Sequence, residues 1–280
     1  MLVTLSEILK IADARQCAIG SFNTPNLTTL KAVIETAEEL NQPVIIMHAQ
    51  VHEEMGLCKM DEIGPIMLFM ADRAKVPVCV HLDHGEDLYY VKRGLDIGFT
   101  SVMYDGSTLD KEINYANTAI AVEMALATGA SVEAEIGSMG ARESGGAGSD
   151  ESIYTDPEDA RDFSYQTGID ALACAFGTAH GIYLKKPKLD LERLSKIHEI
   201  VDIPLVMHGG SGMDREDYIE VIRRGIRKVN YYTYLSKAGG EAADKLKDKT
   251  FFHDVEVAAL NGMKDCVKET IMVTGRLDWK

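Results

Sequence analysis

The sequence predicts an α/β fold, a (β/α)8 TIM barrel that forms a single domain over residues 1–280. Short runs of β-branched and apolar residues alternate along the chain with longer segments whose apolar residues recur at helical spacing. Eight such units are more than an open doubly wound sheet usually contains. Neither a G-x-G-x-x-G motif after the first strand nor a P-loop motif occurs. A closed barrel therefore fits the pattern better than a nucleotide-binding sheet.

The elements are expected in a regular order. Strands are predicted near residues 17–23, 44–49, 78–83, 100–104, 131–136, 171–176, 205–208 and 228–231. Helices are predicted between them, among others at 27–40, 61–75, 112–127, 157–166, 191–200 and 215–224, with a C-terminal helical segment near 254–274. Each connecting segment is long enough for a helix to cross back over the sheet.

Glycine and proline mark the boundaries of these elements. A glycine that can adopt a left-handed conformation is expected to end four helices, at Gly98, Gly129, Gly168 and Gly225. A proline opens three strands, where the missing N–H is not needed, at Pro43, Pro77 and Pro204.

The charge balance limits the partners of the chain. Asp and Glu number 44 against 29 Lys and Arg, and the resulting net charge of −15 disfavours nucleic acids and anionic membranes as partners. An anionic substrate must then be held by backbone N–H groups, a metal or a few fixed cations. The five cysteines are scattered, and neither a signal peptide nor an apolar run of about 18 residues is apparent, so a cytoplasmic protein is expected.

Three histidines, each followed by glycine, stand after predicted strands. Because barrel enzymes carry their chemistry at the carboxyl ends of the strands, His84, His180 and His208 are expected on one rim. Three histidines can bind one divalent ion and leave a position open, as in catalytic zinc sites.

The other histidines are interpreted differently. His81 lies two residues before Asp83 on the same strand face, so we expect it one layer deeper, in the core or supporting a ligand. Packing or surface positions are expected for the remaining four, His48, His52, His198 and His253.

Two further groups on the same rim suggest chemistry. Asp83, beside His84, is placed to exchange a proton with a substrate hydroxyl, or alternatively to orient a histidine. The glycine-rich segment 209–212, with Asn230 and Thr233, follows the last two strands, where barrels often bind phosphate; a simple helix-starting turn is the alternative. No lysine is expected at an inner strand position, so a Schiff base is not predicted.

A loop at about 137–152 is rich in Gly, Ser and acidic residues. We expect it to be mobile and to close over a substrate, with a plain surface insertion as the alternative.

Taken together, five segments resemble the class II, metal-dependent ketose-bisphosphate aldolases. The segments are HLDHG (81–85), VEAEIG (132–137), GTAHG (177–181), HGGSG (208–212) and KVN (228–230), and the resemblance extends over residues 4–273. That family includes fructose-bisphosphate and tagatose-bisphosphate aldolases, which form or cleave a carbon–carbon bond to dihydroxyacetone phosphate.

The resemblance implies a role for each matching residue. The ligands of a catalytic zinc would be His84, His180 and His208, and a second or displaced metal could use Asp105 and Glu135. Asp83 would move the proton of the hydroxyl at the cleaved bond, and Glu143 that of the dihydroxyacetone carbon. Substrate would be bound by Asn23, Gly181, Gly209, Gly210, Ser211, Asn230 and Thr233. A monovalent cation (Na⁺ or K⁺) near the phosphate and a homodimer or homotetramer are also implied.

Three departures concern the distal half of the substrate. Ala49 stands where the bisphosphate enzymes usually have serine, Tyr232 where they have an acid or alanine, and 249–253 lacks the arginine that binds the distal phosphate. Without that fixed cation a second phosphate lacks its partner. The expected function is zinc-dependent cleavage of a ketose 1-phosphate or ketose bisphosphate to dihydroxyacetone phosphate and an aldehyde, with a neutral or carboxylated distal end preferred.

Three alternatives remain open from the sequence. They are a fructose- or tagatose-bisphosphate aldolase proper, another zinc-dependent barrel enzyme such as an epimerase or amide hydrolase, and a non-catalytic barrel that binds sugar phosphates.

Overall fold

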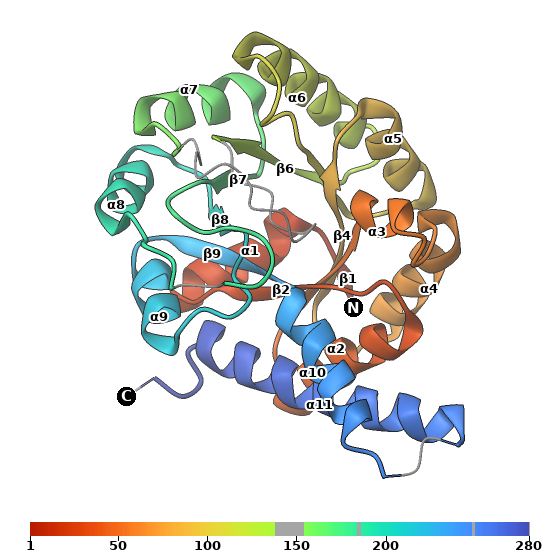
Figure 1. Ribbon diagram of the computed structural model, residues 1–280. Coiled ribbons are helices and arrows are strands. Elements are labelled where there is room, and N and C mark those ends of the chain that lie inside the picture. Colours follow the sequence, from red (N-terminus) through yellow and green to blue (C-terminus); the bar gives the residue numbers. More distant parts are fainter. Residues whose placement is uncertain (138–153, 184–185, 248–249, 280) are drawn as a thin grey trace.

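The strands of the computed structural model, which describes residues 1–137, 154–183, 186–247 and 250–279, close into a parallel barrel (Figure 1). Its strands pair in the order β4-β3-β2-β9-β8-β7-β6-β5, and β5 pairs back with β4. The predicted TIM barrel is therefore confirmed.

The eight barrel strands lie within two residues of their predicted bounds. They are β2 (Ile19–Asn23), β3 (Val44–Ala49), β4 (Val78–Gly85), β5 (Ser101–Tyr104), β6 (Ser131–Ile136), β7 (Ala171–Cys174), β8 (Leu205–Met207) and β9 (Ile226–Tyr231). A short additional strand, β1 (Leu2–Val3), pairs with the start of β4. The sequence does not predict it, because two residues leave no periodic pattern.

Helices surround the strands (Figure 1). They are α1 (Leu5–Arg15), α2 (Leu27–Leu40), α3 (Gln50–Glu54), α4 (Met60–Arg73), α5 (Leu88–Ile97), α6 (Lys111–Leu126), α7 (Pro157–Thr167), α8 (Leu191–Ile200), α9 (Arg215–Arg223), α10 (Thr233–Asp244) and α11 (Phe252–Thr274). Gly98 and Gly168 cap α5 and α7 in the left-handed conformation, as the sequence predicts. The C-terminal helix α11 packs against α10 and α2.

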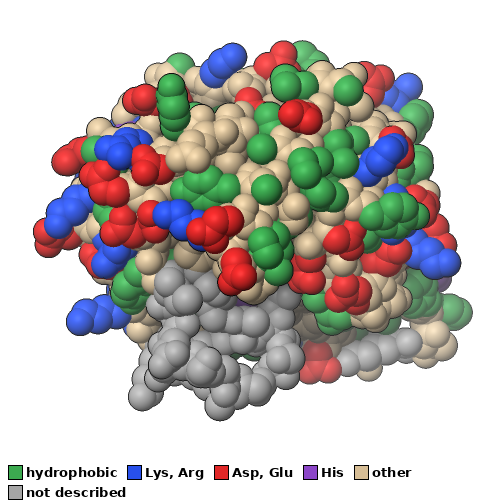
Figure 2. Space-filling view, turned by 90° about the horizontal axis from the view of Figure 1, so that it is seen from above, with side chains coloured by type: hydrophobic (Ala, Val, Ile, Leu, Met, Phe, Trp, Pro, Cys, Tyr) green, Lys and Arg blue, Asp and Glu red, His purple; other side chains and the backbone are tan. Residues whose placement is uncertain are grey.

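The outer surface is charged and mixed in sign. On the face in Figure 2, Lys and Arg side chains are interspersed with Asp and Glu. Some are paired one helical turn apart, as Lys92 is with Asp96 on α5. No helix among the described residues combines the length and apolar character needed to cross a membrane. All five cysteines are free thiols.

The amino end of the barrel interior is apolar. Helix α1, whose start is fixed by a capping box between Thr4 and Glu7, buries Leu9 against inward side chains such as Ile45 and Val206. This helix fills one end of the barrel, so space for a ligand is left at the other.

A polar layer lies above the apolar one. His81, Glu133 and Lys228 are completely buried, and Lys228 Nζ is 2.9 Å from Glu133 Oε2. The expectation that no lysine occupies an inner strand position is therefore wrong: the carboxylate of Glu133 compensates the buried ammonium. Lys228 Nζ also donates a hydrogen bond to Asn230 Oδ1 (2.7 Å), so its protons are engaged inside the barrel.

Candidate active site

A cavity of about 340 Å³ opens at the carboxyl end of the barrel, lined by residues at or just after all eight barrel strands. A larger cavity of about 580 Å³ lies between α9 and α11, but it contains none of the predicted site residues. We assign the candidate site to the smaller cavity, because the predicted polar side chains converge there.

The structure brings together the three histidines predicted as metal ligands. His84 lies at the end of β4, His180 in the loop after β7, and His208 directly after β8. The ring centroid of His84 is 5.0 Å from that of His180 and 4.6 Å from that of His208. One nitrogen of each ring lies within 4.8 Å of the others, so the three can hold a single metal ion.

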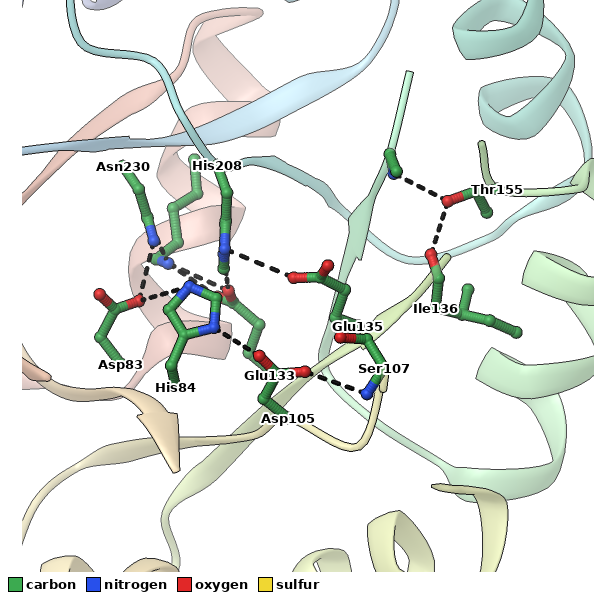
Figure 3. A network of polar contacts seen from close by, with 12 residues as sticks. Asp83, His84, Asp105, Ser107, Glu133, Glu135, Ile136, Thr155, His208 and Asn230 are labelled. Carbon is green, nitrogen blue, oxygen red and sulfur yellow. Dashed lines mark hydrogen bonds and ion pairs between the residues drawn. The ribbon is translucent and has the colours of Figure 1, made fainter. Parts of the chain in front are cut away.

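Carboxylates orient two of these histidines from behind (Figure 3). Asp105 Oδ2 lies 2.6 Å from His84 Nδ1, and Glu133 Oε1 lies 2.9 Å from His208 Nε2. The opposite nitrogens, His84 Nε2 and His208 Nδ1, are buried without a hydrogen-bond partner among the described residues. A carboxylate behind each ligand histidine is the usual support in metal sites. These residues therefore fit a bound divalent ion.

The electrostatics of the cluster favour a cation. Burial lowers the pKa of His180 to about 3 and also lowers the pKa of His208, which keeps both in the neutral form that binds metals. Burial opposes charge on His84 too, but the carboxylates of Asp83 and Asp105 outweigh it and raise the pKa of His84 to about 10. The carboxylates of Asp83 and Asp105 thus stabilise a positive charge at this position, whether on a protonated His84 or on a bound metal ion.

The backbone of β4 explains how two adjacent residues both reach the cavity. A regular strand would turn Asp83 and His84 to opposite faces. Instead β4 runs to Gly85, two residues beyond its predicted end, and its pairing with β5 is irregular between Leu82 and Gly85. His84 adopts a left-handed φ of 46°, which costs a non-glycine residue on the order of 1 kcal/mol or more. Both side chains consequently line the cavity.

Asp105 and Glu135 form a second potential metal group with His84. Because His84 belongs to both groups, the two arrangements overlap rather than forming independent sites. Asp105 is already engaged, by His84 through Oδ2 and by the N–H of Ser107 through Oδ1 (3.0 Å). Glu135 Oε2 lies 3.6 Å from His208 Nδ1 (Figure 3).

Asp83 is held by two asparagine amides. Asn23 Nδ2 donates to Asp83 Oδ2 and Asn230 Nδ2 donates to Asp83 Oδ1, both at 2.9 Å. Burial by itself would raise the pKa of Asp83, but positive charge at His84 and Lys228 and the hydrogen bond from Asn23 hold it below its usual range. Asp83 is therefore a carboxylate that can accept a proton. Asn230 is predicted only as a substrate-binding residue, and its contact shows that this side chain also holds the carboxylate of Asp83 in place.

The predicted phosphate loop is a folded turn beside these groups. Gly209 has a φ of 64°, and a Cβ there would overlap the backbone of Ala179, so only glycine fits. Tyr183 ties the two loops together, because its hydroxyl donates to Gly209 O (2.9 Å) and accepts from Ala179 N (2.8 Å). Ser211 Oγ accepts the N–H of Tyr232 (2.9 Å).

Comparison with known proteins identifies the relatives of this barrel. The family model "Fructose-bisphosphate aldolase class-II" matches residues 3–278. This chain belongs to that family. The YdjI aldolase of Escherichia coli K12 is 33% identical, with a TM-score of 0.87 and 98% of each chain covered.

Two other solved structures are similar. A Coccidioides immitis protein described as a fructose-1,6-biphosphate aldolase is 29% identical, with a TM-score of 0.87, covering 99% of this chain and 98% of that one. Fructose-bisphosphate aldolase of Campylobacter jejuni, at 23% identity and a TM-score of 0.81, covers 98% of this chain and 95% of its own, and supports the fold alone.

Not every residue that the sequence predicts for the active site lines the cavity. Gly210 and the completely buried His208 are not among the described residues that line it. The N–H of Gly210 donates to Asn230 O (3.1 Å) and its carbonyl accepts the hydroxyl of Tyr218. Gly210 therefore shapes the loop rather than offering an N–H to a substrate. Glu143, and all of the predicted mobile loop except Gly137, lie outside the described residues.

Two residues that line the cavity contact each other in a way that the sequence does not predict. His52, expected in a packing or surface position, lines the cavity together with Tyr232. Their ring centroids are 4.5 Å apart. No local signal could have joined them, since 180 positions separate them and only barrel closure brings them together.

Proposed function

We propose that this protein is a zinc-dependent class II aldolase that reversibly cleaves a ketose 1-phosphate or ketose bisphosphate to dihydroxyacetone phosphate and an aldehyde. The observation that carries the proposal is the cluster of His84, His180 and His208 beside Asp83, in which the carboxylates of Asp105 and Glu133 orient two of the three rings. Membership of the family and the fit of these residues to a divalent ion support it.

His84 and His208 would hold the zinc through the nitrogens opposite those that contact Asp105 and Glu133, and His180 would be the third ligand. Zinc supplies a positive charge that stabilises the oxygen becoming negative as the carbon–carbon bond breaks, without a lysine Schiff base. Asp105 and Glu135 would serve a second or displaced metal position.

Two carboxylates would move protons. Asp83, ionised and steadied by Asn23 and Asn230, would take the proton from the hydroxyl on the carbon that becomes the aldehyde. In the reverse direction it would return that proton. Glu143 would carry the proton to and from the dihydroxyacetone carbon; this role rests on the family resemblance alone.

The phosphate shared by these substrates would be bound by the loops that follow β7, β8 and β9. Gly181, Gly209, Ser211 and Thr233 line the cavity there, and backbone N–H groups can hold an anion in an acidic protein. Asn23 would also meet a substrate hydroxyl.

The distal half of the substrate would be neutral or carboxylated. Ala49 and Tyr232 line the cavity where polar residues would help bind a second phosphate. Each missing charge-assisted hydrogen bond forfeits roughly 1.5–3 kcal/mol, or about 10- to 10²-fold in specificity. A monovalent cation, a homodimer or homotetramer, and a cytoplasmic location remain predictions.

Cleavage of a panel of sugar phosphates tests this function. Metal-replete enzyme is given ketose 1-phosphates and fructose and tagatose bisphosphates, and release of dihydroxyacetone phosphate is measured. Cleavage with a higher kcat/KM for a ketose 1-phosphate is expected. A clear preference for a bisphosphate would contradict the specificity, and no release from any of these substrates would contradict the function.

A further inference from the structure

His52 and Tyr232 form an aromatic wall on one side of the cavity. His52 lies on α3, just after β3, and Tyr232 directly follows β9. Strand β2 pairs with both β3 and β9, so the wall spans the carboxyl end of β2, where Asn23 is the last residue. The planes of the two rings are inclined by 54° at a centroid distance of 4.5 Å.

One nitrogen of His52 has no partner within the described protein. The residue is only 3% exposed, and its Nδ1 is buried without a hydrogen bond to any described residue. Leaving such a group unmatched lowers the stability of the protein, which suits a position that binds a ligand. The nearby His48 is different, because its Nε2 lies 3.0 Å from the hydroxyl of Tyr90. Of these two neighbouring histidines, His52 is therefore the one whose ring in the cavity wall has a nitrogen without a hydrogen bond to a described residue.

The aromatic wall lies on the side of the cavity where the aldehyde half of a substrate would extend. Asn23, at the end of β2, donates to Asp83, and the charge of Asp83 acts on His52. Asp83 would contact the hydroxyl on the aldehyde side of the cleaved bond, so the wall lies where that side would extend. Burial lowers the pKa of His52 more than Asp83 raises it, so the imidazole is neutral.

We infer that His52, packed against Tyr232, is a specificity-determining residue that forms a hydrogen bond with a hydroxyl group on the aldehyde half of the substrate. The inference rests on the proposed aldolase function and adds the residue that selects the aldehyde. A neutral ring can pair with a sugar hydroxyl but gives a distal phosphate dianion no opposite charge. Tyr232 acts as a positioning residue, because its ring packs against that of His52.

Two substitutions of His52 test this assignment in the metal-replete, full-length enzyme. His52→Phe keeps an aromatic ring against Tyr232 and removes both nitrogens, whereas His52→Asn keeps a polar donor. His198→Phe, at an exposed histidine on α8, is the matched control. Each variant is assayed with the ketose 1-phosphate that the wild type cleaves fastest, and with analogues that lack one hydroxyl beyond the cleaved bond.

A second assay reports on the other half of the substrate. Exchange of the carbon-bound proton of dihydroxyacetone phosphate with solvent deuterium needs no aldehyde. His52→Phe should lower kcat/KM for the complete sugar by about 10-fold, while one deoxy analogue and the exchange reaction stay within about twofold of wild type. His52→Asn should keep more of the preference for the complete sugar, and it decides the question if His52→Phe does not fold.

Two results would overturn the assignment while leaving the aldolase function intact. One is an equal loss with the complete sugar, its analogues and the exchange reaction. The other is no loss with any of them. If the wild type itself failed to exchange the proton of dihydroxyacetone phosphate, the proposed function would fail, and this inference with it.

Discussion

The two ends of the barrel interior are built from the same strands, but one end is packed with apolar side chains and the other carries polar side chains. At the amino end, α1 buries apolar residues such as Leu9 against Ile45 and Val206. At the carboxyl end, the inward residues include histidines and carboxylates, and some buried nitrogens of those histidines have no hydrogen-bond partner among the described residues. Burial of apolar surface stabilises the fold, whereas unmatched polar groups cost stability and suit a ligand. Substitutions at the two ends should therefore separate stability from activity.

The largest effect is expected at the histidine cluster. His180→Ala should abolish tight metal binding and lower kcat/KM by about 10³-fold or more, because several kcal/mol of charge stabilisation is lost. The free energy of unfolding of the metal-free protein should change little. Elemental analysis, cleavage assays and urea titration measure these three quantities, with His198→Ala, at an exposed histidine on α8, as the control. Full zinc content in His180→Ala would remove this residue from the ligand set.

The opposite outcome is expected at the apolar end. Leu9→Ala should lower the free energy of unfolding by about 2–5 kcal/mol, because it leaves a cavity among packed side chains. The kcat of the folded enzyme should be unchanged. Denaturant unfolding measures the loss, and Leu126→Ala, at a residue that is 73% exposed, is the matched control. A fall in kcat at full folding would show that the two ends are coupled.

Asp83 should separate metal binding from proton transfer at the carboxyl end. Asp83→Ala should retain zinc and fold but lose about 10²-fold or more in cleavage, since a positioned acid/base contributes about that factor. Asp96→Ala, on the exposed face of α5, should behave as wild type. Near-normal turnover of Asp83→Ala would assign proton transfer to another residue.

The smallest effect is expected in the phosphate loop. Ser211→Ala should raise KM with a loss of about 10-fold in kcat/KM, because one hydrogen bond to an anion is removed. Ser195→Ala, on α8, is the control, since its hydroxyl donates to Leu191 O in the same helix. Steady-state kinetics distinguish the expected KM effect from a fall in kcat, which would place Ser211 nearer to the reacting atoms.

The sequence predicts most of the fold because its boundaries depend on local chemistry. Gly98 and Gly168 end helices where a left-handed residue is required, and the barrel strands were located to within two residues. The sequence also predicts that the three histidines lie together, because each has a glycine beside it at a strand end.

What the sequence missed depends on contacts between distant strands. In the sequence, Lys228 is a charged residue in a short strand. Its buried partner, Glu133, lies on another strand and reaches it only because the barrel is closed. His52 similarly acquires its neighbour Tyr232 through barrel closure. The left-handed backbone of His84 could not be expected from the sequence either, since it breaks the strand alternation on which the prediction relied.

Stepwise return of zinc to metal-free enzyme tests the central claim most directly. Protein freed of metal with a chelator should release no dihydroxyacetone phosphate from a ketose 1-phosphate that the untreated enzyme cleaves. Activity should rise in proportion to added zinc and level off at about one equivalent per chain, as expected for a single three-histidine site. Full cleavage by protein shown by elemental analysis to contain no metal would contradict the account.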